Sequence, residues 1–293
     1  MILYMKVPTK WIMLFCILFI FIFSLYFREY NEYFTTINDM VHQVGFKKKH
    51  SSKTPYQKID VIQFEKNSHE WDKCVFIDDK VHMCTNERYH DLLAEIPMSY
   101  LKSPKNALII GGSDGQLLSV LLNHPTIQRI DVIDIDKKLA KIMKKHYDNK
   151  IFPTMKKVNF IIGDATAMID SAPNKIYNLV IVDIFKEFKG EPSLNTSRFF
   201  RRCKQKLDSS QGIFIKRGGL TKKDIVKKEE LEGSKEFEIN ASIYKLLKPI
   251  FKQCKVIKIR NKNLGIDHLF TICSSTVELN TQNNKYRKYY QLT

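Results

Sequence analysis

Apolar runs separated by polar turns alternate, from residue 101 onward, with stretches whose apolar residues recur every three or four positions. The runs predict strands over 107–110, 130–134, 158–162, 178–183 and 212–215, and the periodic stretches predict helices over 116–123, 137–147, 165–169 and 199–207. A helix over 243–251 and two late strands over 256–259 and 269–273 follow. Apolar strands that alternate with helices indicate an α/β domain with a parallel sheet covered on both faces.

Before residue 101 the pattern is different, because the apolar runs are short and alternate with polar residues. Runs over 59–64, 73–77 and 80–83, the last two joined by Asp78-Asp79, predict a small antiparallel unit with a hairpin turn. A helix over 87–101 links it to the larger domain, and the charged residues 221–240 predict a loop or a short exposed helix. The expected division is a tail over 1–10, an apolar span over 11–27, a basic stalk over 28–54, a small β-domain with its linking helix over 55–100, and a Rossmann-like nucleoside-binding domain over 101–293.

The apolar span from Trp11 to Phe27 carries no charged residue. It reaches the short end of the roughly 17–25 residues that cross a bilayer as a helix, and bulky and charged residues follow it where a cleaved signal peptide has small ones. The span therefore predicts an uncleaved signal-anchor and a single-pass membrane protein. Because Lys6 and Lys10 precede it, the positive-inside rule favours an N-terminus in the cytosol and a lumenal domain.

The formal net charge of +17 suggests an anionic partner such as a membrane surface or nucleic acid. The lysines are scattered, however, and the chain lacks an arginine-rich arm, zinc-finger spacing and an aromatic RNA-binding motif, so we expect no specific nucleic-acid partner. Besides Cys16 in the span there are five cysteines without CxxC spacing. We expect structural thiols and no metal site, and the cysteine count leaves the compartment open.

A glycine-rich turn, Gly111-Gly112-Ser113-Asp114-Gly115, joins the first long strand to its helix. Glycines let backbone amides approach a ligand, and a helix N-terminus offers unpaired N–H groups. The turn lacks the third glycine of the G-x-G-x-x-G dinucleotide fingerprint, and Asp114 would repel a pyrophosphate. We therefore expect a nucleoside cofactor with a positive sulfonium or amino group, such as S-adenosylmethionine or its decarboxylated form.

Four acids stand at or just past the carboxyl ends of successive predicted strands: Asp114, Asp134, Asp164 and Asp183. Ligands of open α/β sheets bind at these strand ends. An acid after the second strand accepts hydrogen bonds from ribose hydroxyls, and one after the third reaches an adenine amino group. A single such Asp is often only a helix cap, but four beside one glycine turn favour a nucleoside site.

The sequence resembles the spermidine/spermine synthase family, the aminopropyltransferases with a PABS domain, over roughly residues 55–275. The residues 108–115 are similar to the family's LIIGGGDG, and His124-Pro125 with 132–136 are similar to its HP…VEID. Gly163-Asp164-Ala165, Tyr56-Gln57 and Tyr89-His90-Asp91 are similar to its GDA, YQ and YHE segments. The resemblance implies a small antiparallel β-domain before a Rossmann-like sheet of the class I methyltransferase type. It also implies a tendency to form homodimers.

The resemblance also implies roles for single residues. The residues that would contact the nucleoside are Gln57, Asp134, Asp164 and Ala165. Those that would contact the aminopropyl arm and its amine are Gly111, Gly112, Asp114 and Gly115. Tyr89 would assist at the substrate amine. The family reaction is attack by a neutral amine on the carbon next to the sulfonium of decarboxylated S-adenosylmethionine, and it needs a carboxylate near the nucleophile.

The departures from the family pattern concern the acceptor. Where the family has D-x-x-D-P after the fourth strand, this chain has Asp183-Ile184-Phe185-Lys186-Glu187, so Lys186 replaces the expected catalytic Asp. Asp183, Glu187 or Tyr89 would then have to act as the catalytic residue. Two further positions also differ, because Arg217 and His82 each stand where the family usually has Gln. Three hypotheses follow: a divergent aminopropyltransferase acting on an unusual amine, a methyltransferase that uses intact S-adenosylmethionine on another acceptor, and a non-catalytic relative.

Overall fold

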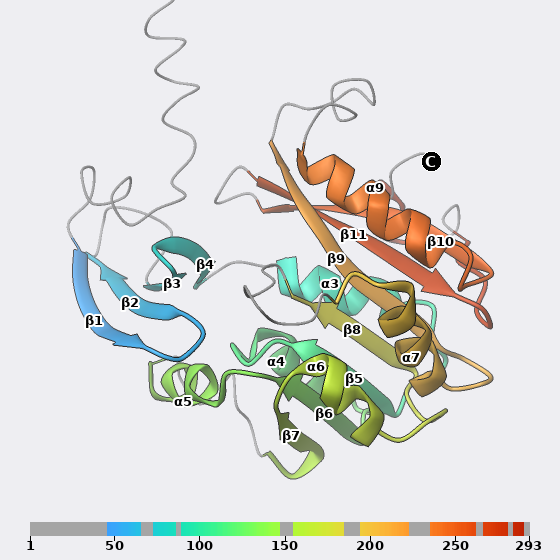
Figure 1. Ribbon diagram of the computed structural model, residues 1–293, viewed down its shortest axis with the longest axis horizontal. Coiled ribbons are helices and arrows are strands. Elements are labelled where there is room, and N and C mark those ends of the chain that lie inside the picture. Colours follow the sequence, from blue (N-terminus) through green and yellow to red (C-terminus); the bar gives the residue numbers. More distant parts are fainter. Residues whose placement is uncertain are drawn as a thin grey trace, which may run out of the picture.

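The computed structural model describes residues 46–65, 73–85, 89–146, 155–184, 194–222, 235–261, 266–280 and 284–289. Two sheets make up this part of the chain (Figure 1). A small four-stranded sheet lies beside helix α5, and a seven-stranded sheet forms the centre of the larger domain. The predicted combination of a small antiparallel sheet with a Rossmann-like sheet is confirmed.

The small sheet is antiparallel in the order β1-β2-β3-β4. Its strands are β1 (Phe46–Lys53), β2 (Lys58–Phe64), β3 (Lys73–Ile77) and β4 (Lys80–Cys84). Asp78 and Asp79 form the β3–β4 turn with φ angles of 49° and 63°, the left-handed conformation that two-residue hairpins favour. Strand β1 lies in the segment 28–54 that we expected to be a stalk, because its mostly exposed polar residues hid a strand that pairs along all of β2.

The large sheet has the order β10-β11-β9-β8-β5-β6-β7. Its strands are β5 (Asn106–Gly111), β6 (Arg129–Asp134), β7 (Val158–Ile162), β8 (Leu179–Asp183), β9 (Ile213–Lys222), β10 (Gln253–Asn261) and β11 (Ile266–Ser274). Strands β5 to β9 run parallel, whereas β11 pairs antiparallel with both β9 and β10. The expected parallel sheet is therefore found for β5 to β9 but not at this edge, where the connection from β10 to β11 is too short for a crossover.

Helices cover both faces of the large sheet (Figure 1). They are α3 (Tyr89–Met98), α4 (Gln116–Leu122), α5 (Lys137–His146), α6 (Ala165–Met168), α7 (Ser197–Lys206) and α9 (Lys235–Leu247), with short 3-10 turns η1 (Met155–Lys157), η2 (Ile169–Ser171) and η3 (Arg287–Tyr289). Helix α9 begins in the charged stretch predicted as a loop or short helix and ends before residue 251, the predicted end.

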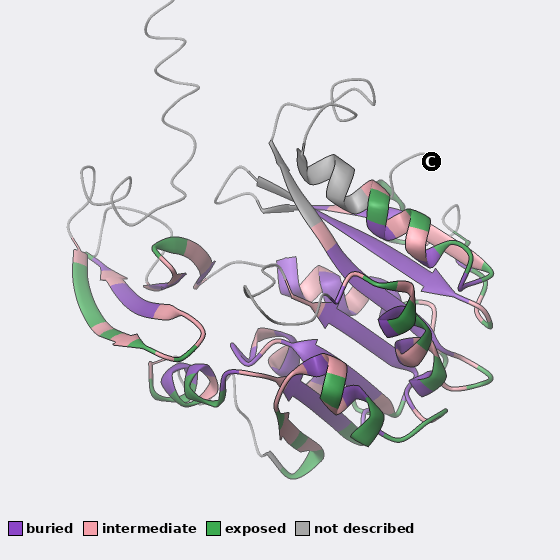
Figure 2. Cartoon of the chain, in the orientation of Figure 1, coloured by how far each residue is buried: buried purple, intermediate pink, exposed green. Residues whose placement is uncertain are grey.

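The central strands β5, β6 and β8 are buried on both sides (Figure 2). On β5, Ala107 and Ile109 pack with α3, α4 and α5, while Leu108 and Ile110 pack with α7 and α9. Each of the Leu and Ile side chains contributes about 1.5–3 kcal/mol when it is fully buried. One face of the small sheet, through Val61, joins the first of these clusters. The carboxyl ends of β5, β6 and β8 face the small sheet, because residues from both line one cavity.

Four cysteines form two disulfides, Cys74–Cys84 between β3 and β4 and Cys254–Cys273 between β10 and β11. Each pair lies directly opposite in the register of neighbouring antiparallel strands. Cys203 is a buried free thiol. The expectation of structural thiols was wrong for these four residues, because their pairing depends on strand register and leaves no CxxC spacing in the sequence.

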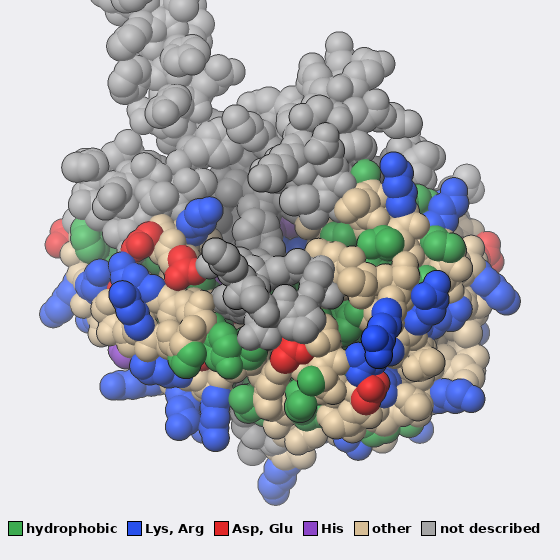
Figure 3. All heavy atoms as spheres, in the orientation of Figure 1, with side chains coloured by type: hydrophobic (Ala, Val, Ile, Leu, Met, Phe, Trp, Pro, Cys, Tyr) green, Lys and Arg blue, Asp and Glu red, His purple; other side chains and the backbone are tan. Residues whose placement is uncertain are grey.

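The apolar span 11–27 and the part of the stalk before residue 46 lie outside the described residues. Among the helices that are described, none is both long enough and apolar enough to cross a membrane. Lys and Arg side chains are spread over the visible face of the molecule (Figure 3).

Candidate functional site

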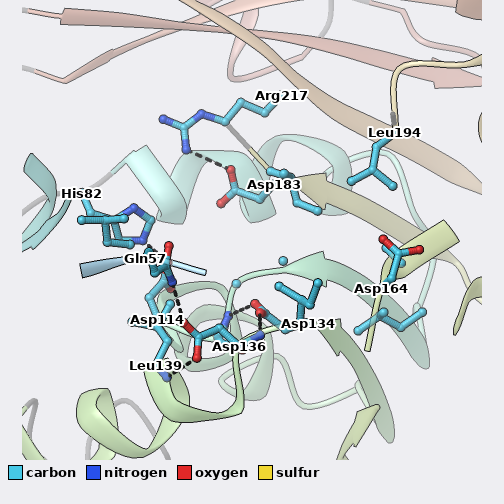
Figure 4. A pocket seen from close by; sticks show the side chains of 18 of the residues that line it. Gln57, His82, Asp114, Asp134, Asp136, Leu139, Asp164, Asp183, Leu194 and Arg217 are labelled. Carbon is cyan, nitrogen blue, oxygen red and sulfur yellow. Dashed lines mark hydrogen bonds and ion pairs between the residues drawn. The ribbon is translucent and has the colours of Figure 1, made fainter. Parts of the chain in front are cut away.

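A cavity of about 520 Å³ lies at the carboxyl ends of β5, β6, β7 and β8, and the β3–β4 hairpin borders it on the other side. All four strand-end acids line it: Asp114, Asp134, Asp164 and Asp183 (Figure 4). The volume is in the range of small-molecule sites. Because parallel strands bring their carboxyl ends to one edge, acids 69 positions apart in the sequence, from 114 to 183, meet at one site.

The glycine turn forms the floor of the cavity beside β8. Gly111 and Gly112 have φ angles of 85° and 81°, which residues with a side chain rarely adopt. A Cβ on Gly111 would lie 2.8 Å from the backbone oxygen of Asp183, so the close approach of β5 and β8 at this point requires glycine. Gly115, with φ 84°, precedes the first turn of α4 and is not among the residues that line the cavity.

Asp114 is a buried acid that faces the hairpin. Its side chain accepts a hydrogen bond from His82 Nε2 at 3.0 Å and one from the backbone N–H of Gln116 at 3.0 Å. Burial by itself would raise the pKa of Asp114, but the hydrogen bond from His82, the nearby His90 and the Gln116 N–H together hold the pKa well below its usual range. The site therefore contains a charged carboxylate in a place of low solvent access.

Asp134 and Asp136 form the side of the cavity at the end of β6. Asp134 accepts hydrogen bonds from the backbone N–H groups of Ser113 at 3.1 Å and Asp136 at 2.8 Å. Burial raises the pKa of Asp134 above its usual value, and these bonds offset the effect only in part. Asp136 in turn accepts hydrogen bonds from Gln57 Nε2 and Thr54 Oγ1, both at 2.9 Å, which tie the small sheet to the cavity wall.

Asp164 both caps a helix and lines the cavity. One oxygen accepts hydrogen bonds from the backbone N–H of Ala167 at 3.0 Å and from the Thr166 hydroxyl, which fixes the start of α6. Ala165 lines the cavity beside it. The cap and the predicted nucleoside contact are compatible, because a carboxylate has a second oxygen.

A second group of residues lies on the side of the cavity opposite Asp134 (Figure 4). Arg217 Nη1 lies 3.3 Å from Asp183 Oδ1, and Arg217 Nη2 lies 3.1 Å from His268 Nδ1. The Tyr89 ring stacks on His268 with centroids 4.2 Å apart, and the Arg217 guanidinium carbon lies 5.6 Å from that ring. His90 Nε2 lies 3.7 Å from Asp183 Oδ2, and neither nitrogen of this ring has a hydrogen-bond partner among the described residues.

The predicted residues divide into three groups. Gln57, Gly111, Gly112, Asp114, Asp134, Asp164, Ala165 and Asp183 line the cavity. Tyr89 lies behind Arg217 and does not line the cavity, like Gly115. Lys186 and Glu187 are outside the described residues. The catalytic and binding roles of all these residues stay predictions.

The structure adds residues to which the sequence analysis gave no role. Arg217 pairs with Asp183, Asp136 holds Gln57, and His268 holds Arg217. The sequence held a signal for two of them, because Arg217 and Asp136 come just after predicted apolar strands, where ligand-binding residues are expected. His268 had no such signal. In the described ranges, no group of three or more His, Cys, Asp or Glu is arranged to hold a metal ion.

Proteins of similar sequence are named polyamine aminopropyltransferases. The polyamine aminopropyltransferase of Saccharolobus solfataricus is 28% identical over 209 residues, covering 69% of this chain and 63% of the relative. That of Clostridium botulinum is 27% identical over 169 residues, covering 57% of each. The chain thus spans about three fifths of the length of these relatives.

Solved structures share the fold. A spermidine synthase in complex with the transition state analogue AdoDATO has a TM-score of 0.66 at 19% identity, covering 79% of this chain and 75% of that one. The spermidine synthase of Thermotoga maritima has a TM-score of 0.63 at 18% identity, covering 79% and 74%. A family model described as "Spermine/spermidine synthase domain" matches residues 86–265, which is more than half of the 293-residue chain. This chain therefore belongs to the spermine/spermidine synthase family.

Proposed function

We propose that this chain is a divergent aminopropyltransferase that binds decarboxylated S-adenosylmethionine and transfers its aminopropyl group to an amine. The observation that carries the proposal is Asp114, a carboxylate 3% exposed beside the glycine turn, whose pKa is held low, against burial, mainly by the hydrogen bond from His82. A buried anion suits the positive aminopropyl arm of this co-substrate and opposes a carboxylate or a pyrophosphate there. Gly111 and Gly112 line the cavity beside Asp114, and their lack of side chains suits a close approach of the arm to the backbone.

The other side chains of the cavity fit the rest of the co-substrate. Asp134 stands where ribose hydroxyls donate hydrogen bonds, and Asp164 with Ala165 stands where an adenine base binds. Gln57, held by Asp136, supports the nucleoside from the small sheet. In this assignment the nucleoside lies along β6 and β7, and the arm reaches over β5 toward β8.

The transfer itself needs a free lone pair on the acceptor. The amine nitrogen attacks the propyl carbon bonded to the sulfonium, the C–S bond breaks, and its electron pair stays on sulfur, which leaves neutral methylthioadenosine. The proton that the acceptor amine must lose before the attack goes to a base, and the product leaves as a secondary ammonium. Asp183 is the described carboxylate at this end of the cavity, and Tyr89 and Glu187 are the other candidates from the sequence.

A second candidate function is methyl transfer from intact S-adenosylmethionine. It is favoured by Arg217, a cation that lines the same cavity and could neutralise the methionine carboxylate. Lys186, in place of the family's catalytic acid, favours the third hypothesis, in which the protein binds the nucleoside but catalyses no transfer.

Calorimetry of the full-length chain in mild detergent distinguishes these functions. We expect methylthioadenosine and decarboxylated S-adenosylmethionine to bind at least tenfold more tightly than S-adenosylhomocysteine. The reverse order would support methyl transfer, and no binding of any of the three would refute both enzyme functions. Binding without release of methylthioadenosine in the presence of an acceptor panel would support the non-catalytic alternative.

We also propose that residues 11–27 anchor the protein in a membrane with the domain in an oxidising compartment. Disulfides persist in secretory and extracellular compartments and are rare in the cytosol, and two occur here. The test is glycan mapping at the two sequons, Asn195-Thr196-Ser197 and Asn240-Ala241-Ser242, with alkaline extraction of membranes. A glycan at either site supports the orientation. An extractable chain with reduced cysteines contradicts the proposal.

A further inference from the structure

Arg217 places a buried positive charge at the acceptor end of the cavity. Its side chain is 7% exposed, and it lines the cavity from the middle of β9. A buried charge is costly unless partners hold it. The position is therefore a specific feature of this site, unlike the lysines spread over the surface (Figure 3).

Two neighbours fix the direction of the Arg217 guanidinium. His268 Nδ1 accepts a hydrogen bond from Nη2 at 3.1 Å, which requires an unprotonated nitrogen. Burial, and then the charges of Arg217 and His90, lower the pKa of His268 well below its usual value, so the ring is neutral and acts as an acceptor. The Tyr89 ring, stacked on His268, supports the guanidinium from the side. The cation is thus preorganised toward Asp183 (Figure 4).

The contact between Arg217 and Asp183 is longer than a strong ion pair. Its 3.3 Å exceeds the roughly 2.7–2.9 Å of good charge-assisted hydrogen bonds. The other oxygen of Asp183 lies 3.7 Å from His90 Nε2. The acceptor end therefore presents a carboxylate and a guanidinium side by side, and a ligand with one charge of each sign can engage both.

A diamine matches this end poorly. One amine must approach Asp183 to react, and its second, protonated amine would then lie close to the buried Arg217 guanidinium. Like charges in a site of low dielectric repel strongly. An amine that also carries a carboxylate is matched at both charges, because its carboxylate pairs with Arg217 while its amine faces Asp183.

We propose that the acceptor is an amino acid, a molecule with both an amine and a carboxylate, and that Arg217 is the residue that selects it. The inference rests on the proposed aminopropyl transfer and names its acceptor class. The carboxylate binds to the guanidinium and the amine gives a proton to Asp183, which frees the lone pair for attack. The products are an N-(3-aminopropyl) amino acid and methylthioadenosine, with one proton released to solvent.

Putrescine and 4-aminobutanoate form a matched pair of probes, because a carboxylate replaces one aminomethyl group of the same chain. Their binding to the full-length chain is measured by calorimetry with saturating methylthioadenosine, and methylthioadenosine release from decarboxylated S-adenosylmethionine is followed by chromatography. We expect the wild-type chain to prefer 4-aminobutanoate by at least tenfold in Kd and in kcat/KM.

Arg217→Gln should weaken 4-aminobutanoate binding roughly tenfold to hundredfold, since a hydrogen bond to a charged group is lost, without weakening putrescine binding. Arg217→Lys should restore part of the loss. Lys204→Gln on α7, outside the cavity, is the control and should change neither ligand.

The outcomes separate this inference from the proposed function. A wild-type chain that binds methylthioadenosine but prefers putrescine would overturn the inference and leave aminopropyl transfer standing. Equal loss of both acceptors in Arg217→Gln would also overturn it, because the residue would then be merely structural. A chain that does not bind methylthioadenosine would refute the proposed function and the inference together.

Discussion

Replacing Asp134 by Asn tests whether the end of β6 binds ribose. The substitution keeps the size of the side chain and removes its charge. Hydrogen bonds to charged groups contribute about 1.5–3 kcal/mol, against about 0.5–1.5 kcal/mol for neutral pairs. If ribose hydroxyls donate to this carboxylate, methylthioadenosine should bind with a Kd raised by roughly 5- to 10-fold, which corresponds to the difference of about 1–1.5 kcal/mol between the two ranges.

The same substitution should change how stability depends on pH. Burial, offset only in part by the N–H groups of Asp136 and Ser113, raises the pKa of Asp134 above its usual 3.8. A carboxyl with a raised folded-state pKa stabilises the fold when protonated, and this contribution is lost as the pH rises through the folded pKa. Asn offers one acceptor oxygen to the two N–H groups that Asp134 binds, which costs stability at any pH. Because the wild-type chain also carries the cost of the charge at pH 7, Asp134→Asn should lose less stability relative to the wild-type chain at pH 7 than at pH 4.

Calorimetry with methylthioadenosine and urea denaturation at pH 7 and pH 4 measure the two effects. Asp170→Asn is the control, because Asp170 pairs with Arg202 on an exposed surface outside the cavity. Unchanged affinity in Asp134→Asn would refute the assignment of ribose to this strand end. A stability difference from the wild-type chain that is the same at pH 4 and pH 7 would contradict the raised pKa of Asp134.

Three further predictions concern other parts of the site and fold. Gly111→Ala should destabilise the chain by about 1–2 kcal/mol from its positive φ alone, and the clash with the Asp183 backbone oxygen should also weaken methylthioadenosine binding; a stable variant with intact binding would contradict the close approach of β5 and β8. Asp114→Asn should weaken decarboxylated S-adenosylmethionine at least tenfold in calorimetry but leave methylthioadenosine, which lacks the arm, within about threefold. Because the pKa of Asp114 is lowered in the folded chain, the charged carboxylate stabilises the fold above the unfolded pKa near 3.8, and this effect is lost as the pH falls below that value. The free energies of unfolding of the wild-type chain and Asp114→Asn should therefore converge as the pH falls below 4. A constant difference between them would exclude the buried charge. Peptide mapping without reduction should recover Cys74 linked to Cys84, and free thiols at both positions would contradict this pairing.

Local pattern was enough to predict much of the fold. Strands β5 to β8 and their helices follow from apolar runs and helical periodicity, which depend on neighbours a few positions away. The rule that ligands bind at strand ends then selected Asp114, Asp134, Asp164 and Asp183, and all four line one cavity. Pattern failed for β1, whose exposed polar residues give no apolar run, and for the antiparallel edge, because direction is not encoded in a strand's own residues.

The partners of these acids were decided by the tertiary structure. His82 with Asp114, Gln57 with Asp136 and Arg217 with Asp183 join residues 32, 79 and 34 positions apart, and no periodicity relates them. The disulfides likewise depend on the register between strands. The sequence by itself determined that a nucleoside-type site of clustered carboxylates lies at one edge of a Rossmann-like sheet. Only the packing of the hairpin and of β9 and β11 against that edge decided which carboxylates are paired with cations, because side-chain contacts across elements are set by three-dimensional proximity.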